Sequence, residues 1–120
     1  MSRSERYAKI IREEIAQILQ TKINDRRLRA VTITLVEVTG DLSVARVHYS
    51  VWDEKNFNRA KAKQAIEAAT GFIRRELGQR VEARIVPELR FIYDDSIQRG
   101  VDLAKKIQSL NQNHEPSATA

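Results

Sequence analysis

The chain has 120 residues, a formal net charge of +5 and a calculated isoelectric point of about 9.8, with 42% hydrophobic and 31% charged residues. Such a chain can close one hydrophobic core, but it is too short for a binding domain and a separate catalytic domain. Because it contains no cysteine, disulfides, thiolate metal sites and cysteine nucleophiles are excluded. The sequence has no apolar run of membrane-spanning length and no secretory leader pattern, so a cytoplasmic protein with no membrane partner is expected.

Arginine carries most of the positive charge, with 14 Arg against 7 Lys. The planar guanidinium can donate two hydrogen bonds to one anionic group, which suits phosphate. Many basic proteins bind no nucleic acid, however, so the charge alone leaves the partner open.

The first predicted element is a helix that ends at about Thr21. Ser2 and Glu5 have the spacing of a capping box, and apolar residues recur at helical intervals from Tyr7 to Leu19. A solvated helix face is the simplest interpretation of a basic row with i+3 spacing, formed by Arg3, Arg6, Lys9 and Arg12. Residues 22–29, which include Arg26 and Arg27, are predicted to form a basic loop because their apolar content is low.

Three strands are predicted from alternating apolar and polar residues, at 31–35, 45–51 and 87–93. Thr39-Gly40-Asp41 separates the first two, which favours a β-hairpin, and Pro87 opens the third. The order helix, strand, strand, interrupted helix, strand, helix predicts an α+β fold. Its small sheet should be largely antiparallel, with the helices on one face.

The interrupted helix is predicted over residues 59–78, with Gly78 as its C-terminal stop. Its apolar stripe passes through Gly71, although an internal glycine costs roughly 0.5–1 kcal/mol relative to alanine. Two explanations are open. Ala69-Thr70-Gly71 could bend the helix, with Thr70 capping a second helix whose free N–H groups attract phosphate beside Arg74 and Arg75. Alternatively, Gly71 lets another element pack closely and both arginines are ordinary surface residues. Further positive charge lies in the same half of the chain, at Lys61, Lys63, Arg80, Arg84 and Arg90.

The last helix is predicted over residues 97–110, with Asp95 and Gln98 as a capping pair. Residues 111–120 have no periodicity and should form a mobile tail, which leaves one domain over residues 1–110. Asp94-Asp95-Ser96 reads as a turn and helix cap more readily than as a metal-binding pair.

No catalytic centre is expected. The two histidines, His48 and His114, lie in a strand pattern and in the tail, and neither a Gly-rich phosphate loop nor a nucleophile elbow is present. No cofactor or metal is therefore predicted. An alternative to RNA binding is a basic protein-interaction module that uses Trp52 and Phe57 as an apolar contact patch.

Residues 87–97, Pro-Glu-Leu-Arg-Phe-Ile-Tyr-Asp-Asp-Ser-Ile, are followed by Gly100 and resemble the closing strand and turn of the ribosome-binding factor A family. Asp41-Leu42 and Ala45-Arg46-Val47 are similar to the second-strand entry of that family. The resemblance covers about residues 3 to 110. Two departures stand out, since Arg26 occupies a position where the family often has proline, and Thr70 stands where serine is common.

The resemblance implies a type II KH-like domain in which an Ala-x-Gly kink, here Ala69-Thr70-Gly71, replaces the usual Gly-x-x-Gly loop. It further implies a non-catalytic assembly factor, expected to be a monomer, that binds the free small (30S) ribosomal subunit and its ribosomal RNA. Such a factor supports late maturation, RNA processing and growth in the cold, and other assembly factors are possible partners. The expected RNA-binding residues are Ala69, Thr70, Gly71, Arg74, Arg75, Lys63, Arg80, Arg84, Arg90, Arg26 and Arg27.

Overall fold

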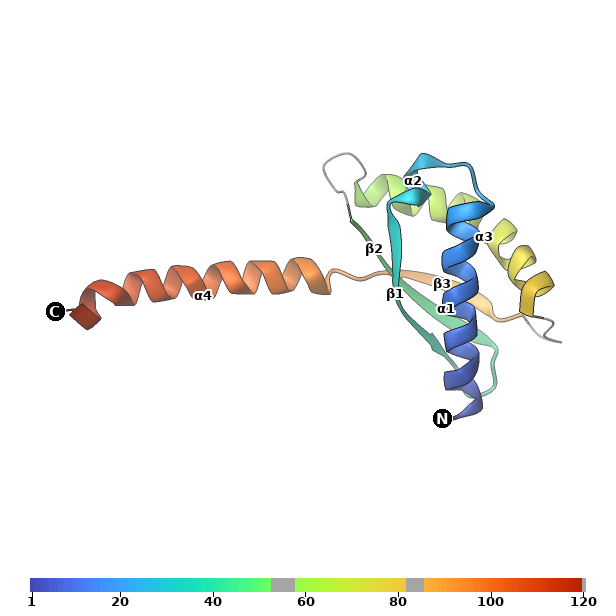
Figure 1. The fold of residues 1–120 in the computed structure, drawn as a ribbon, viewed down its shortest axis with the longest axis horizontal. Coiled ribbons are helices and arrows are strands. Elements are labelled where there is room, and N and C mark those ends of the chain that lie inside the picture. Colours follow the sequence, from blue (N-terminus) through green and yellow to red (C-terminus); the bar gives the residue numbers. More distant parts are fainter. Residues whose placement is uncertain (53–57, 82–85, 120) are drawn as a thin grey trace.

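The computed structural model describes residues 1–52, 58–81 and 86–119, with the backbone alone at 97, 98 and 112–119. Its elements follow the predicted α+β order, with one short helix added (Figure 1). In chain order they are α1 (Arg3–Thr21), α2 (Arg26–Arg29), β1 (Val31–Val38), β2 (Val44–Val51), α3 (Arg59–Val81), β3 (Glu88–Tyr93) and α4 (Ser96–Thr119).

Helix α1 begins as its sequence predicts. The Ser2 hydroxyl accepts a hydrogen bond from the Glu5 N–H at 3.1 Å, so it satisfies a donor that the first helical turn leaves free. Ile11, Ile15 and Ile18 then recur on one side of the helix and are fully buried. This stripe fixes α1 against the sheet.

Helix α2 corrects the prediction of a basic loop over residues 22–29. The Asp25 carboxylate accepts a hydrogen bond from the Arg27 N–H at 2.9 Å and caps the short helix. Leu28 is fully buried between exposed or half-exposed arginines. One apolar residue and one cap are therefore enough to order a segment whose average composition is that of a loop.

The sheet has the strand order β1-β2-β3. Strands β1 and β2 form the predicted antiparallel hairpin, but β2 and β3 pair in parallel, so the prediction of a largely antiparallel sheet is wrong. The cause is α3, which carries the chain from the end of β2 back to the start of β3 as a crossover connection. The Arg59 guanidinium at the start of α3 lies 4.2 Å from the ring centroid of Tyr93 at the end of β3, as this path requires.

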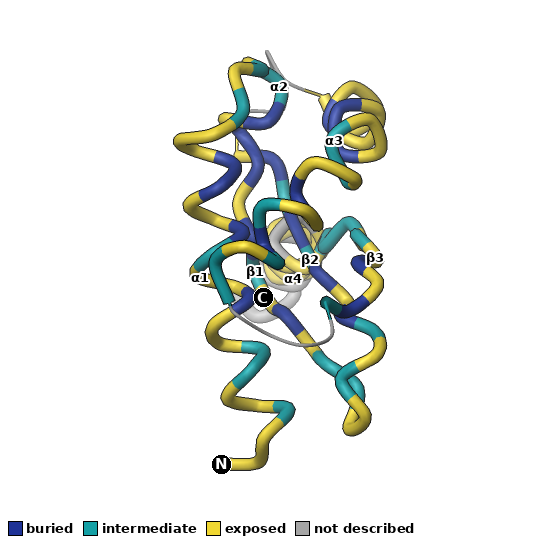
Figure 2. The backbone as a smooth tube through the Cα atoms, turned by 90° about the vertical axis from the view of Figure 1, so that its right-hand side faces the viewer, coloured by how far each residue is buried: buried dark blue, intermediate teal, exposed yellow. Residues whose placement is uncertain are grey.

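The hydrophobic core lies between one face of the sheet and helices α1 and α3 (Figure 2). Val47, Tyr49 and Leu89 are among the strand residues that point into it. The opposite face of the sheet carries the alternate residues and is open, with exposed side chains at Thr32, Leu35, Glu37, Arg46, Arg90 and Ile92.

Helix α3 corrects two predictions. It is helical without interruption from Arg59 to Val81, so neither a break at Gly71 nor a stop at Gly78 is present. Ile66 before Gly71 and Ile73 after it are both buried in the same core, and this packing holds the two halves in one helix. The ribbon of α3 nevertheless changes direction about halfway along its length (Figure 1).

Helix α4 extends away from the body of the molecule (Figure 1). All its described side chains from Arg99 to Asn111 are exposed, including those of Val101, Leu103 and Ile107. The sequence predicts that this helix ends near Leu110, but it continues to Thr119. The mobility of residues 111–120 stays a prediction. Neither α4 nor any other helix of the described chain has the length and apolar character needed to cross a bilayer.

Candidate nucleic-acid interface

A shallow pocket of about 440 Å³ lies between the second half of α3 and the segment that enters β3. It is lined by Gly71, Arg74, Arg75, Gly78 and Val86. The four α3 residues are spaced by three, one and three positions, so they share one side of the helix. Three of the predicted RNA-binding residues, Gly71, Arg74 and Arg75, therefore come together in one place.

The two glycines of this pocket have different surroundings. A Cβ added at Gly71 would meet no atom within 4 Å, so close packing by another element does not explain this glycine. A Cβ added at Gly78 would lie 3.0 Å from Cγ2 of Val86. Close packing against another segment is therefore found about two helical turns after Gly71. Gly71 thus leaves an open patch of helix backbone at the surface.

Ala69 and Thr70 do not form an anion site of the predicted kind. The Thr70 hydroxyl donates a hydrogen bond to the Ile66 carbonyl at 2.7 Å, inside the preceding helical turn, so it does not cap a new helix. Ala69 is half-buried and packs against the core. Because α3 continues through these residues, no helix N-terminus presents free amides here.

Arg74 and Arg75 have different surroundings. The Arg74 guanidinium donates to the carbonyl of Val86 at 2.9 Å and to that of Pro87 at 3.3 Å, so it fastens α3 to the entry of β3. Arg75 is exposed and makes no hydrogen bond or ion pair with any other described residue. Its five donors are therefore available to an external anion.

Most of the other predicted cations lie elsewhere, and several already have partners. Arg80 donates to Glu14 at 3.1 Å and to Gln17 at 2.7 Å, which ties α3 to α1. Arg27 pairs with Asp25 at 2.8 Å, and Arg90 pairs with Glu88 at 3.3 Å on the open face of the sheet. Lys63 and Arg26 are exposed with no partner among the described residues, while Arg84 lies outside them.

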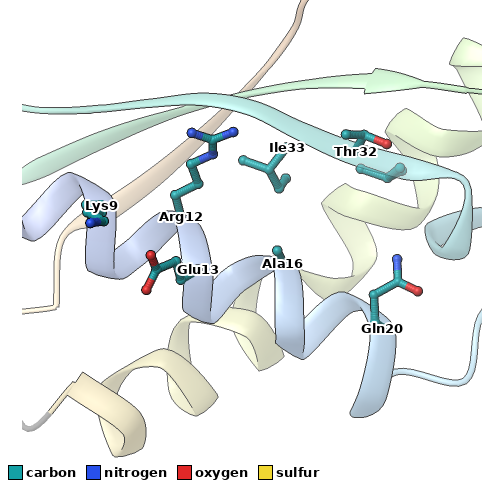
Figure 3. A pocket seen from close by; sticks show the side chains of 8 residues that line it. Lys9, Arg12, Glu13, Ala16, Gln20, Thr32 and Ile33 are labelled. Carbon is teal, nitrogen blue, oxygen red and sulfur yellow. The ribbon is translucent and has the colours of Figure 1, made fainter.

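A second pocket, of about 450 Å³, lies between α1 and the edge strand β1 and was not predicted from the sequence (Figure 3). Lys9 and Arg12 line it together with Gln20 and the start of β1, and the Arg12 side chain reaches toward the strand. The i+3 spacing of these cations was the available signal, but a solvated face was the simpler interpretation. Glu13 also lines this pocket, which makes it less positive than the pocket on α3.

The carboxylate of Asp94 orders the turn that leads into α4, whereas the predicted capping pair of Asp95 and Gln98 involves a side chain outside the described ones. It accepts hydrogen bonds from the Ser96 N–H at 2.9 Å and from the Thr34 hydroxyl at 2.8 Å. The bonds from the Ser96 side chain, the Ser96 backbone and Thr34 lower the pKa of Asp94 to about 2. On the open face of the sheet, His48 Nε2 lies 2.9 Å from Glu37 Oε1. No group of three or more His, Cys, Asp or Glu in the described ranges could hold a metal ion.

Comparisons with known proteins agree with this architecture. The family model described as ribosome-binding factor A matches residues 3–107. The ribosome-binding factor A of Pediococcus pentosaceus is 40% identical over 111 residues, which are 92% of this chain and 96% of the relative.

Two solved structures share the fold. The crystal structure of ribosome-binding factor A from Thermus thermophilus has a TM-score of 0.65 and 24% identity, and covers 75% of this chain and 94% of its own. A Thermus thermophilus homology model fitted into an electron cryo-microscopy map of a 30S complex has a TM-score of 0.63 and 23% identity, over 80% of this chain and 97% of its own. The resemblance first noted in residues 87–97 is confirmed by the family match, and the chain belongs to the ribosome-binding factor A family.

Proposed function

We propose that this chain is a non-catalytic assembly factor that binds the small (30S) ribosomal subunit through its ribosomal RNA. Membership of a family named for ribosome binding supports this role, as does the fold neighbour from Thermus thermophilus that was fitted into a map of a 30S complex. In this molecule the observation that carries the proposal is Arg75, an exposed guanidinium that has no partner among the described residues and lies beside the open backbone of Gly71. We assign the factor to late subunit maturation and RNA processing in the cytoplasm, including growth in the cold.

The pocket on α3 suits a phosphate of the RNA backbone. Arg75 can donate two parallel hydrogen bonds to one phosphate, and Gly71 leaves room for the RNA to approach the helix. Arg74 contributes indirectly, because its bonds to Val86 and Pro87 hold the opposite wall of the pocket in position. The side chain of Arg75 takes the role first expected of free backbone amides.

The wider architecture follows from the same proposal. We assign the chain to the type II KH-like class, with Ala69-Thr70-Gly71 in the middle of α3 at the position of the usual Gly-x-x-Gly loop. Residues 1–110 form the RNA-binding domain of a monomer, and residues 111–120 form a mobile tail. Lys63 and Arg26, both exposed and without a described partner, add favourable charge around the main contact.

The test is co-sedimentation of charge-reversal variants with purified small subunits. Arg75→Glu should weaken binding by roughly 10- to 150-fold, because a charge-assisted hydrogen bond to phosphate is replaced by repulsion. Arg46→Glu is the matched control, since Arg46 is also exposed but lies on the open face of the sheet, away from α3. Equal binding of both variants, with the folded state verified by circular dichroism, would reject the pocket on α3 as the RNA contact.

A further inference from the structure

Trp52 is an exposed aromatic residue in a position that the core does not explain. Its side chain is 68% exposed, more than that of any other large apolar residue in the described chain except the N-terminal Met1. It follows β2 directly, whereas Val51 before it is buried. Leaving most of an indole in water forgoes a sizeable hydrophobic stabilisation, and tryptophans with one apolar and one hydrogen-bonded end are enriched at interfaces.

The indole is held in place although it is exposed. The Trp52 backbone N–H donates to the Ala30 carbonyl at 3.1 Å, and its Nε1–H donates to the Arg29 carbonyl at 3.4 Å. The same Arg29 carbonyl also accepts a bond from Gln20 at 3.5 Å. Because these bonds anchor the ring at its edge, they do not occupy its π faces, and a fixed ring loses little entropy on binding.

The described elements next to Trp52 carry exposed cations. Arg26 and Arg29 are exposed on the adjacent helix α2, and Lys22 is exposed at the end of α1. Within the described chain none of these three side chains pairs with a carboxylate, and Arg29 contacts only the neutral amide of Asn24, at 3.4 Å. Arg27 differs from them, because its charge is compensated by Asp25.

A fixed aromatic face beside cations that have no carboxylate partner in the described chain fits a nucleotide better than a protein. A protein hot spot would need further apolar area around the ring, but Gln20 and Arg29, the described residues linked to it through the Arg29 carbonyl, are both polar. In single-stranded RNA the base has a π face and the flanking phosphates carry negative charge, which matches both features.

We propose that Trp52 is a base-stacking platform for single-stranded RNA, with Arg26 and Arg29 receiving the flanking phosphates. This second contact rests on the proposed function and extends it. Figure 1 places α2 beside the first half of α3, whereas the pocket lies along the second half.

The test uses the fact that Trp52 is the only tryptophan of the chain, so intrinsic tryptophan emission reports on this position alone. A labelled uridine-rich oligonucleotide is added to the full chain, and tryptophan emission is followed together with the anisotropy of the label. Stacking predicts quenching that tracks the binding curve. Trp52→Ala should weaken RNA binding by roughly 5- to 150-fold, whereas Trp52→Phe should retain most of the affinity. Leu35→Ala, at an exposed apolar residue on the open face of the sheet, is the matched control and should bind normally.

Three outcomes would overturn the proposal. If the anisotropy rises while the emission stays constant, RNA binds elsewhere, and only the stacking proposal fails. If Trp52→Ala binds the oligonucleotide as tightly as the wild type does, the ring takes no part in the contact, and again only the stacking proposal fails. If neither the oligonucleotide nor small subunits bind the wild-type chain, the proposed function fails as well.

Discussion

Arg74 and Arg75 are adjacent in sequence, but the structure gives them different tasks. Arg74 bridges the carbonyls of Val86 and Pro87, where backbone acceptors before β3 would otherwise rely on water. Arg75 projects into solvent with no described partner. Arg74 maintains the pocket, whereas Arg75 is available to a ligand. Substitutions at Arg74 should therefore affect mainly stability, and substitutions at Arg75 mainly binding.

Substituting each arginine by alanine tests this separation. Arg74→Ala should lower the free energy of unfolding by about 1 kcal/mol, because two hydrogen bonds to carbonyls are lost. Arg75→Ala should change it by less than about 0.5 kcal/mol, as is usual for an exposed side chain without partners. Urea unfolding of the two variants measures both values, and an equal loss would show that Arg74 does not fasten β3 to α3.

Asp94 makes a specific contribution to stability that depends on pH. Its pKa is lowered from 3.8 to about 2, so the native state holds the ionised carboxylate more strongly than the unfolded chain does. Its stabilising effect is therefore complete above pH 3.8 and is lost as the pH falls through about 2. Asp94→Ala should lower the thermal unfolding midpoint at neutral pH. The gap in midpoint between this variant and the wild type should narrow as the pH falls from 3.8 to about 2. A gap that stays constant down to pH 2 would contradict this role of the carboxylate.

The residue type of the candidate site could be predicted from the sequence, but the availability of each side chain could not. The excess of arginine suits a phosphate partner, and Arg75 was among the candidates. Whether an arginine is free depends on residues far away in the chain, as with Arg80, whose partner Glu14 is 66 positions distant. Spacing along one element carries no information about such partners.

At the scale of elements, α3 shows how packing outweighs local propensity. The internal Gly71 costs roughly 1 kcal/mol of helix stability relative to alanine. This cost is small beside the burial of Ile66 and Ile73, each worth about 1.5–3 kcal/mol. The helix therefore continues through Gly71 and then through Gly78, where the absence of a side chain makes room for Val86. Close packing, which was one of the two explanations for Gly71, is therefore wrong for that residue, and it is found instead at Gly78.

Alanine substitutions at the two glycines should have different effects. Gly71→Ala should raise the free energy of unfolding by about 0.5–1 kcal/mol, since alanine favours the helix and its Cβ would meet no neighbour. The same variant should bind RNA more weakly, because the methyl group occupies the open patch beside Arg75. Gly78→Ala should gain less stability, as its Cβ would press against Val86. Thermal unfolding compares the variants, and a destabilised Gly71→Ala would show that the bend of α3 requires glycine.

The order and type of the main elements were predictable, whereas strand direction was not. Periodicity identifies a strand such as residues 87–93 but does not state which neighbour it joins. The parallel pairing of β3 follows from the path of α3, which appears only once both pack on the sheet. Helix α2 was missed because Leu28 is a single buried residue, and one residue makes no periodic pattern.

At the scale of the whole molecule, the chain consists of a packed body and a projecting helix. Its extents of 69 × 35 × 17 Å reflect α4, whose described side chains add nothing to the core. Within the body, internal contacts already engage several cations, including Arg27, Arg74 and Arg80. On the proposed function, the net charge of +5 attracts RNA in general, while the cations without a partner among the described residues determine where it docks.

The most direct test of this account is the salt dependence of RNA affinity, measured for the wild type, Arg75→Glu and Arg46→Glu. Binding through several phosphates predicts that the logarithm of the affinity falls steeply and linearly with the logarithm of salt concentration. Losing one phosphate contact in Arg75→Glu should reduce that slope by about 0.7 to 0.9, with Arg46→Glu unchanged. A wild-type affinity that does not vary with salt, or a slope that Arg75→Glu leaves intact, would contradict docking at the pocket on α3.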